Sequence, residues 1–325
     1  MIKFRRFLNE DAPALIKCIR EEYGSTYFRK NFYNEEKLIN ENQNGSVKFF
    51  IAEDDKELAG ILAFEILSDE NICELICGII SKNHRGRHIS TPFFDFVVSE
   101  MKKNPVNSMC CYPVLYHSIV QNLLENLNFT ACGFVFSEFL DENSSNYYKD
   151  YNNSKKHYGL MFHKINKNDS KIIYLSPELN EIASKIYSSL NVKYEIENKP
   201  EKLIGKSELI VTNNLGQQHC TIKILSSGED LITQIKEIHS KYKSEYQTFN
   251  IFLNINESKS IIAYRELKKL GYFFTGFKPI SGENENLILH NAMNVDINFN
   301  SFVLNEEFTN LKEYVQKCYE RRKEK

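Results

Sequence analysis

The feature that most constrains the fold of this chain is a strand that passes through a basic turn into an amphipathic helix. Residues 74–80 (ELICGII) are an apolar run of strand length, and residues 91–100 place apolar side chains at helical spacing. The turn at 83–90 (NHRGRHIS) holds two arginines, two histidines and one glycine. A helix N-terminus has unpaired N–H groups and a partial positive charge, so this order of elements can bind a phosphate. The alternative interpretation is an ordinary basic turn exposed to solvent.

The segments on either side of this turn predict a mixed α/β fold. Strand and helix periodicities alternate along the first half. They give strand 2–7, helices 12–24 and 34–41, a hairpin at 46–67, strand 74–80, helix 91–100, strand 107–116, helix 117–129, and strands 129–140 and 157–165. Strands that alternate with helices after an antiparallel start indicate a mixed, mostly antiparallel central sheet flanked by helices.

The second half repeats part of this order after a polar segment at 166–170, which we interpret as a linker. Residues 125–134 (ENLNFTACGF) and 268–277 (KKLGYFFTGF) share a helix end, a turn residue, an aromatic strand and a final Gly-Phe. This similarity predicts an internal duplication. The expected division of the chain is a domain at 1–166, a domain at 170–300 and a C-terminal helix or tail at 301–325.

Charge and cysteine content argue against several functional classes. Lys and Arg number 41 and Asp and Glu 43, so the net charge of −2 argues against broad electrostatic binding of nucleic acid. The eight cysteines lack zinc-site spacing and are interpreted as reduced thiols of a cytoplasmic protein, with no metal site expected. No uncharged apolar run reaches the ~18 residues of a membrane helix, and the N-terminus lacks the apolar region of a signal peptide, so no membrane partner is expected. The oligomeric state stays open.

Three local patterns, together with the order of elements, resemble the GNAT family of N-acyltransferases. The family's phosphate loop reads Gln/Arg-x-x-Gly-x-Gly/Ala between the fourth strand and the third helix, and residues 83–88 occupy this place with Gly86 matching. The first position is Asn in place of Gln or Arg, and His and Ser stand at two later positions where glycine is common. Residues 23–27 (YGSTY) and 117–121 (HSIVQ) are similar to the YGxxY and HxxxQ patterns of a bacterial subgroup. The likeness covers residues 2–165 well and the remainder loosely.

The resemblance implies acetyl-CoA, or another acyl-CoA, as the cofactor. Arg85 and Arg87 would add positive charge around its diphosphate, and Gly86 would let the backbone approach closely. The strand at 74–80 would splay from its neighbour and present backbone groups to the pantetheine arm. The residues that the resemblance assigns to the cofactor are Gly78, Ile79, Ile80, Arg85, Gly86, Arg87, His88, Ser90 and His117.

Three residues are candidates for proton transfer. Glu74 lies where some histone-acetylating relatives carry a general base, and its apolar neighbours would raise its pKa towards neutrality. An exposed glutamate at the start of a strand is the competing interpretation. The tyrosine that the family often uses as a general acid is replaced here by Leu124. Tyr116 and His117, at the start of the next helix, are the nearby candidates, and His117 could instead be a capping or surface residue.

Aromatic side chains between the first two helices would form the acceptor site. Tyr23, Tyr27, Tyr33 and Glu36 suit an amine, either a small molecule or a protein lysine. Packing on a helix face is the simpler explanation for any single one of them.

The second half lacks the basic turn. Glu229 and Asp230 stand at the equivalent place, where they would repel phosphate but cap a helix well. The expected function is therefore acyl transfer, with acetyl transfer to a primary amine by direct attack in a ternary complex, carried by the first half. One rival is a non-catalytic acyl-CoA sensor or scaffold. A nucleic-acid module built on the basic turn is the other, and the neutral net charge argues against it.

Overall fold

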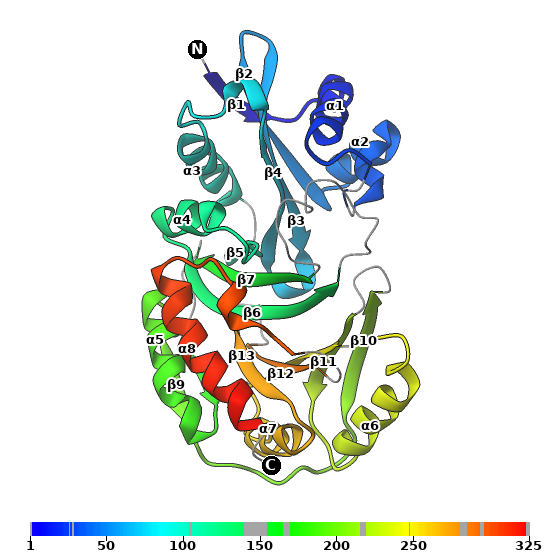
Figure 1. Ribbon diagram of the computed structural model, residues 1–325, viewed down its shortest axis with the longest axis vertical. Coiled ribbons are helices and arrows are strands. Elements are labelled where there is room, and N and C mark those ends of the chain that lie inside the picture. Colours follow the sequence, from blue (N-terminus) through cyan, green and yellow to red (C-terminus); the bar gives the residue numbers. More distant parts are fainter. Residues whose placement is uncertain are drawn as a thin grey trace.

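The computed structural model describes residues 2–25, 27, 29–103, 106–139, 155–164, 170–214, 219–246, 248–279, 285–292 and 296–322. Twelve strands form one twisted sheet in the order β1-β2-β3-β4-β5-β7-β6-β13-β14-β12-β11-β10, and β8 and β9 form a separate pair (Figure 1). Neighbours in the large sheet are antiparallel except β4–β5 and β11–β12, which are parallel. The predicted mixed, mostly antiparallel α/β class is confirmed.

The strands and helices alternate along the chain much as their sequence patterns predict. The strands are β1 (Ile2–Arg6), β2 (Val47–Asp54), β3 (Glu57–Leu67), β4 (Ile72–Ile80), β5 (Ser108–Cys111), β6 (Thr130–Phe139), β7 (Lys155–Lys164), β8 (Lys171–Tyr174), β9 (Tyr194–Glu197), β10 (Glu208–Asn214), β11 (His219–Ser226), β12 (Thr248–Asn254), β13 (Phe273–Lys278) and β14 (Asn286–Ala292). The helices are α1 (Ala12–Tyr23), α2 (Glu35–Gln43), α3 (Ser90–Met101), α4 (Ile119–Asn126), α5 (Asn180–Ser189), α6 (Leu231–Tyr242), α7 (Ser260–Lys269) and α8 (Glu306–Arg321).

The same pattern of strand pairing occurs in both halves. The order β3-β4-β5-β7-β6 of the first half matches β10-β11-β12-β14-β13 of the second, and each contains one parallel pair followed by antiparallel pairs. The halves meet where β6 and β13 pair at Gly133 and Gly276, two positions that correspond in the repeated sequence segments. A side chain on Gly276 would collide with the backbone of Gly133, so this junction requires glycine. One sheet therefore passes through both predicted domains.

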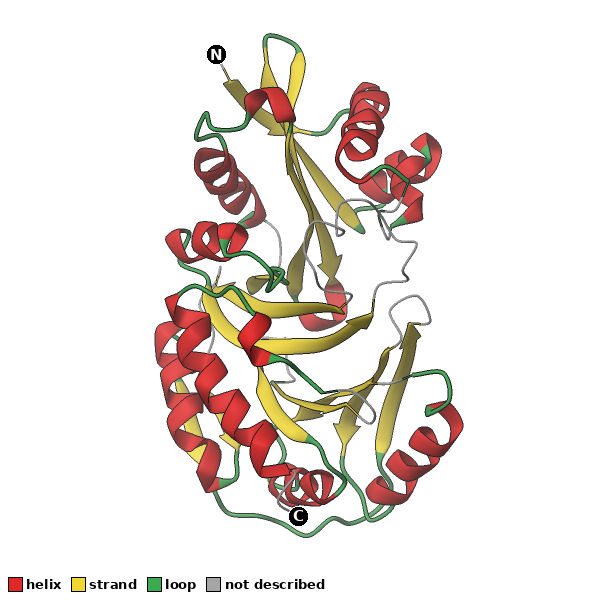
Figure 2. Cartoon of the chain, in the orientation of Figure 1, coloured by secondary structure: helices red, strands yellow, loops and turns green. Residues whose placement is uncertain are grey.

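Helices cover both faces of the first half (Figures 1 and 2). α1 and α2 lie on one side of β4, and α3 and α4 on the other. The α1–α2 side has a hydrophobic core of its own, whereas the core under α3 and α4 continues into the second half. The C-terminal helix α8 packs across the junction, with Phe308 against Phe134 of β6 at a ring-centroid distance of 5.4 Å.

Local sequence explains most of the element boundaries. Asn34 caps α2 by accepting a hydrogen bond from the Lys37 N–H, and the β2–β3 hairpin turns on Asp55 and Lys56 with positive φ. The strand predicted at 107–116 was too long, because β5 ends at Cys111. Pro113 has no N–H to donate and restricts the residue before it, so the ladder cannot continue. The predicted linker at 166–170 lies almost entirely outside the described residues.

Candidate functional site

A cleft opens where β4 and β5 separate. The two strands pair only between Ile72–Leu75 and Ser108–Cys111. β4 then continues for five residues to Ile80, and in the described part of the chain no strand pairs with it on that side. The register with β3 shifts at the same place, from Phe64–Leu75 to Ala63–Cys77, which leaves Ile76 as a bulge. The early end of β5 before Pro113 and this bulge together produce a splayed strand, as the family resemblance implied.

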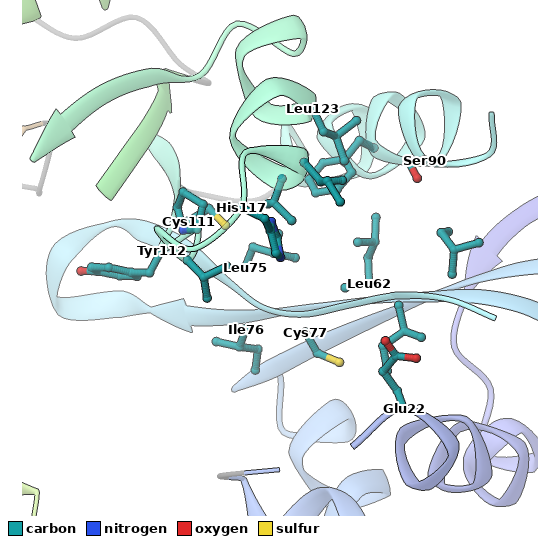
Figure 3. Close-up of a pocket in the computed structure, with 18 of the residues that line it drawn as sticks. Glu22, Leu62, Leu75, Ile76, Cys77, Ser90, Cys111, Tyr112, His117 and Leu123 are labelled. Carbon is teal, nitrogen blue, oxygen red and sulfur yellow. The ribbon is translucent and has the colours of Figure 1, made fainter. Parts of the chain in front are cut away.

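A cavity of about 350 Å³ occupies the cleft. That volume lies within the range of small-molecule sites. Figure 3 shows Glu22 and Ser90 at one end of the cavity and Tyr112 at the other. The lining residues come from the end of α1, from β3, β4 and the end of β5, from α3 and α4, and from the segment between β5 and α4: Glu22, Tyr23, Leu62, Leu75, Ile76, Cys77, Gly78, Ile79, Ile80, Ser90, Phe93, Phe94, Cys111, Tyr112, Pro113, Val114, Tyr116, His117, Ile119, Val120 and Leu123.

The predicted cofactor residues fall into two groups. Those that line the cavity are Gly78, Ile79, Ile80, Ser90 and His117. The other four, Arg85, Gly86, Arg87 and His88, lie in the turn that leads into α3 and are outside the lining. This turn adjoins the end of the cavity that Ser90 marks.

The turn before α3 has the backbone of a glycine-rich loop. Gly86 and His88 both adopt left-handed conformations, with φ of 77° and 55°. His88 therefore takes a conformation for which glycine is the usual choice. A Cβ added to Gly86 would meet no atom within 4 Å, so there is open space against the backbone there. His84 is buried and anchors the turn, with its Nδ1 2.7 Å from Ser81 Oγ.

Both arginines of the turn are paired with carboxylates. Arg85 donates to Glu22 Oε2 at 2.5 Å and to the Ile80 carbonyl at 3.0 Å. Arg87 donates to Asp54 Oδ2 at 2.7 Å. The two arginine side chains are about half exposed, and ion pairs with an exposed member contribute little to stability. Either arginine can therefore exchange its carboxylate partner for a more highly charged anion at a small cost in free energy.

Glu74 lies on β4, one residue before the cavity-lining Leu75. Its cross-strand neighbours are Cys110 of β5 and Glu65 of β3. Burial raises the pKa of Glu74 to about 7. The nearby charges act in both directions: the cations of Lys278 and Arg29 oppose this rise, and the carboxylates of Glu65 and Glu70 add to it. A carboxyl group with this pKa changes its charge near neutral pH.

Tyr116 and His117 both line the cavity. Their rings meet edge to face with centroids 4.9 Å apart, and Figure 3 shows the His117 side chain projecting into the cavity beside Leu75. Burial lowers the pKa of His117, so its imidazole is neutral at neutral pH. The buried Gln121 donates to the carbonyls of His117 and Val114, each at 2.9 Å. The glutamine of the HxxxQ pattern thus holds the segment that carries His117.

The predicted acceptor residues are only partly brought together. Tyr23 lines the cavity and stacks on Tyr27 at 4.8 Å. Tyr27 is 7% exposed and lies outside the lining, and its hydroxyl donates to the carbonyl of the bulged Ile76. The Tyr33 hydroxyl accepts from the Tyr27 N–H at 3.1 Å. Glu36 is exposed in the first turn of α2, away from the cavity lining.

Among the cavity residues that sequence reasoning missed are Glu22 and Tyr112. Glu22 holds Arg85, a contact between residues far apart in the sequence. Tyr112 is the last residue before Pro113, at the point where β5 leaves β4. Burial, with nearby carboxylates, raises the pKa of Tyr112 well above its ordinary value, so the phenol stays protonated. A strand end marked by Tyr-Pro was the available signal. Leu124, in the place of the family's tyrosine, is buried in the core.

Two further properties concern the described residues as a whole. Within them, no three His, Cys, Asp or Glu side chains gather so that they could hold a metal ion. None of the helices described is both long enough and apolar enough to span a membrane.

Among known proteins, this chain is similar to solved structures only in its fold over about half of its length. No protein-family model and no curated protein sequence matches the chain. The spermidine/spermine N-acetyltransferase of Vibrio cholerae is 16% identical, with 51% of this chain and 95% of that one covered at a TM-score of 0.41. An N-acetyltransferase of Staphylococcus aureus has 11% identity, coverages of 51% and 99%, and a TM-score of 0.42. The ribosomal-protein-S18-alanine N-acetyltransferase of Escherichia coli has 12% identity, coverages of 52% and 97%, and a TM-score of 0.41. At these values the likeness carries no weight for function, which has to be inferred from the site.

Proposed function

We propose that the first half of this protein is an acyl-CoA-dependent N-acyltransferase that transfers an acetyl group to a primary amine. The observation that carries the proposal is the cleft between β4 and β5, which ends near the turn before α3 on one side and is lined by Tyr116 and His117 on the other. Glu74 is next to the lining residue Leu75 on β4. When bound, acetyl-CoA supplies an acyl group activated as a thioester. The acceptor is a small-molecule amine or a protein lysine.

The turn before α3 supplies what a diphosphate requires. The N-terminus of a helix of 12 residues carries a partial positive charge, and Gly86 leaves space for an anion to approach the backbone. Arg85 and Arg87 provide two guanidinium groups at the same place. Glu22 and Asp54 hold these groups in position until a phosphate competes for them. Along the cleft, Gly78, Ile79 and Ile80 offer to the pantetheine arm the edge of β4 with which no strand of the described residues pairs.

The proposed proton transfers start at Glu74. An amine with an ordinary pKa is mostly an ammonium ion at neutral pH and has to lose a proton before its nitrogen can attack. A Glu74 carboxylate with a pKa of about 7 accepts that proton at neutral pH, directly or through water. The departing sulfur takes a proton from the Tyr116 hydroxyl, and the second proton that the nitrogen loses as the amide forms restores this hydroxyl, directly or through water. His117 stays neutral and orients the pantetheine arm by hydrogen bonding from its ring nitrogen.

Tyr27 takes a different role from the one predicted. Its buried hydroxyl holds the carbonyl of Ile76, so it fixes the bulge at the point where the strands separate. We therefore place Tyr27 among the residues that position the site, and we keep Tyr23, which lines the cavity, as the aromatic wall of the acceptor site.

Turnover of acetyl-CoA over a panel of amines tests the proposal. Thiol release and acetylated product should both appear for at least one primary amine with the purified full-length protein. The panel should include diamines, amino-acid amides and a lysine peptide. Tight binding of CoA without turnover of any amine would contradict the enzyme assignment and favour the non-catalytic sensor instead.

A further inference from the structure

The segment that leads into the C-terminal helix α8 runs beside the cavity segment between β5 and α4. The Val303 N–H donates to the Leu115 carbonyl at 2.8 Å, and the Asn305 N–H donates to the side-chain oxygen of Gln121 at 3.0 Å. Figure 1 shows α8 beginning close to α4, the helix that contains Gln121. Gln121 and Asn305 are 184 positions apart in the sequence, so a distant part of the chain supports the site of the first half.

The amide group of Gln121 connects these two segments. Gln121 is fully buried, and its nitrogen faces three carbonyl oxygens, those of Val114 and His117 at 2.9 Å each and that of Val303 at 3.1 Å. Its oxygen accepts from the Asn305 N–H. The amide fits in one orientation, because an oxygen in place of the nitrogen would face three other oxygens. One side chain therefore holds the segment before α4 to the segment before α8.

Tyr116 and His117 stand between two fixed points of the backbone. On one side, the Leu115 N–H donates to the His157 carbonyl of β7 at 3.0 Å, and the Leu115 carbonyl accepts from the segment before α8. On the other side, the His117 carbonyl accepts from Gln121. Both side chains line the cavity, so these two anchors set how the rings project into it.

The segment before α8 is itself fixed at the junction of the two halves. Phe302 stacks on Phe136 of β6 with the ring centroids 6.0 Å apart. The Asn305 side chain caps α8 by accepting from the Phe308 N–H at 3.1 Å, and it donates to Glu125 of α4 at 2.9 Å. Contacts with the sheet and with two helices hold this segment in place, so it can serve as a support for the site.

We propose that Gln121 is a positioning residue through which the segment before α8, residues 302–305, fixes Tyr116 and His117 in the active site of the first half. The inference rests on the function proposed above, and it gives the C-terminal helix a part in acyl transfer. Neither Gln121 nor residues 302–305 are among the residues that line the cavity. Their effect on the reaction therefore passes through the two cavity residues that they hold.

The ring signal of His117 in the full-length protein tests this role. The His117 ring meets the Tyr116 ring edge to face, so the ring current of the tyrosine displaces the proton resonances of the imidazole. The spectrum is recorded with labelled histidine at a pH of about 8, where the imidazole is neutral. The His117 signal is identified by its loss in H117N, and Y116L gives its position without the ring contact. In Q121M the signal should move at least half of the way to its position in Y116L.

Asn291→Leu is the matched control for Q121M. Asn291 is also a buried amide, and its nitrogen donates to the Leu270 carbonyl at 3.1 Å within the second half. The substitution N291L removes this donor far from the cavity lining, so the His117 signal should keep its wild-type position.

A pair of substitutions at Asn305 isolates the contribution of the segment before α8. The φ of Asn305 is −75°, which proline can adopt. N305P and N305A both lose the cap of α8 and the contact with Glu125, but only N305P loses the N–H that donates to Gln121. The His117 signal should therefore move towards its Y116L position in N305P, and by less than half as much in N305A.

An unmoved His117 signal in Q121M, or equal shifts in N305P and N305A, would overturn the proposal. A shift in N291L as large as that in Q121M would also overturn it, because the effect would then come from general destabilisation. If Q121M does not fold, the pair at Asn305 decides alone. The spectra need no substrate, so shifted signals without amine turnover would reject the acyltransferase alone. Turnover with unmoved signals would reject the role of Gln121 alone.

Discussion

The turns before α3 and α6 occupy equivalent places in the two halves, but only the first is open to a ligand. Before α6, the Gly228 N–H donates to Ser207 Oγ at 2.8 Å and the Glu229 N–H to the Gly205 carbonyl at 3.0 Å. A Cβ added to Gly228 would lie 2.5 Å from the Gly205 oxygen, whereas one added to Gly86 would meet nothing within 4 Å. The second half thus fills with its own chain the space that the first half leaves for an anion.

The parallel strand pairs of the two halves also differ, and again the second half is the more closed of the two. β11 and β12 pair over six residues, whereas β4 and β5 pair over four before they separate. The Asn254 side chain donates to the Leu225 carbonyl at 3.0 Å and ties the ends of β12 and β11 together. In the first half, Tyr112 and Pro113 follow β5 at the position equivalent to Asn254. Two halves with the same order of strands therefore differ in two short segments, and each difference closes part of the cleft in the second half.

The largest expected effect is that of removing the proposed base, Glu74, from the first half. Glu74→Gln should reduce kcat by about a hundredfold or more with little change in the KM for acetyl-CoA, because an amide cannot accept the proton. In the wild type, kcat/KM should rise with pH about tenfold per unit below a pH of about 7 and then level off, since only the ionised carboxylate is active. Initial rates across pH measure both effects.

Glu229→Gln is the control for this substitution, because it makes the same chemical change in the exposed turn of the second half. Its rate and pH profile should equal those of the wild type. An E74Q protein that keeps the wild-type pH profile would remove Glu74 from the mechanism.

The next largest effect is expected from reversing a charge in the turn before α3. Arg85→Glu should raise the KM for acetyl-CoA by about tenfold or more with a small change in kcat, because it replaces an attraction to the diphosphate by repulsion. Glu229→Lys makes the reverse change in the second half. It should add no second binding site, since residues 205–207 already fill that place. An unchanged KM in R85E would exclude the turn before α3 from cofactor binding.

A smaller effect should follow from releasing Arg85. Glu22→Gln weakens the contact that holds the guanidinium group at 2.5 Å, so less has to be broken when a phosphate binds. The KM for acetyl-CoA should fall by about two- to fivefold, in keeping with the small energies of exposed ion pairs. The dependence of this KM on salt concentration, measured for wild type and E22Q, distinguishes release of Arg85 from loss of the nearby negative charge. A higher KM in E22Q would mean that Glu22 assists binding.

The smallest effect on activity is expected from a substitution in the turn before α6, in the second half. Ser207→Ala removes the oxygen that accepts from the Gly228 N–H, and it should lower the free energy of unfolding by about 1 kcal/mol. Neither kcat nor KM should change, because the first half does not use this turn. Denaturant unfolding and initial rates measure the two quantities. A changed KM would show that the second turn also takes part in cofactor binding.

The order of the elements could be predicted from the sequence because it depends on local patterns. The alternation in β2 and β3, the Asn34 cap and the apolar spacing of α3 all act within a few residues. The splayed strand came from the family resemblance, and the structural cause, Tyr112-Pro113, was present in the sequence but was read as part of a longer strand.

The electrostatic environment of the site could not be predicted in the same way. The partners of Arg85 and Arg87 are Glu22 and Asp54, which are 63 and 33 residues away in the chain. Lys278 reaches Glu70 across 208 residues. Such contacts depend on how the sheet is assembled, and a single sequence has no periodicity that reports them. For the same reason, the exposed position of Glu36 on α2 became visible only in the folded chain.

Calorimetric titration of the full-length protein with CoA tests the central difference between the halves most directly. The open cleft of the first half and the filled turn of the second predict one molecule bound per chain, with binding weakened in R85E and unaffected in E229K. Binding of two molecules per chain, or no heat of binding in the purified wild type, would contradict this account.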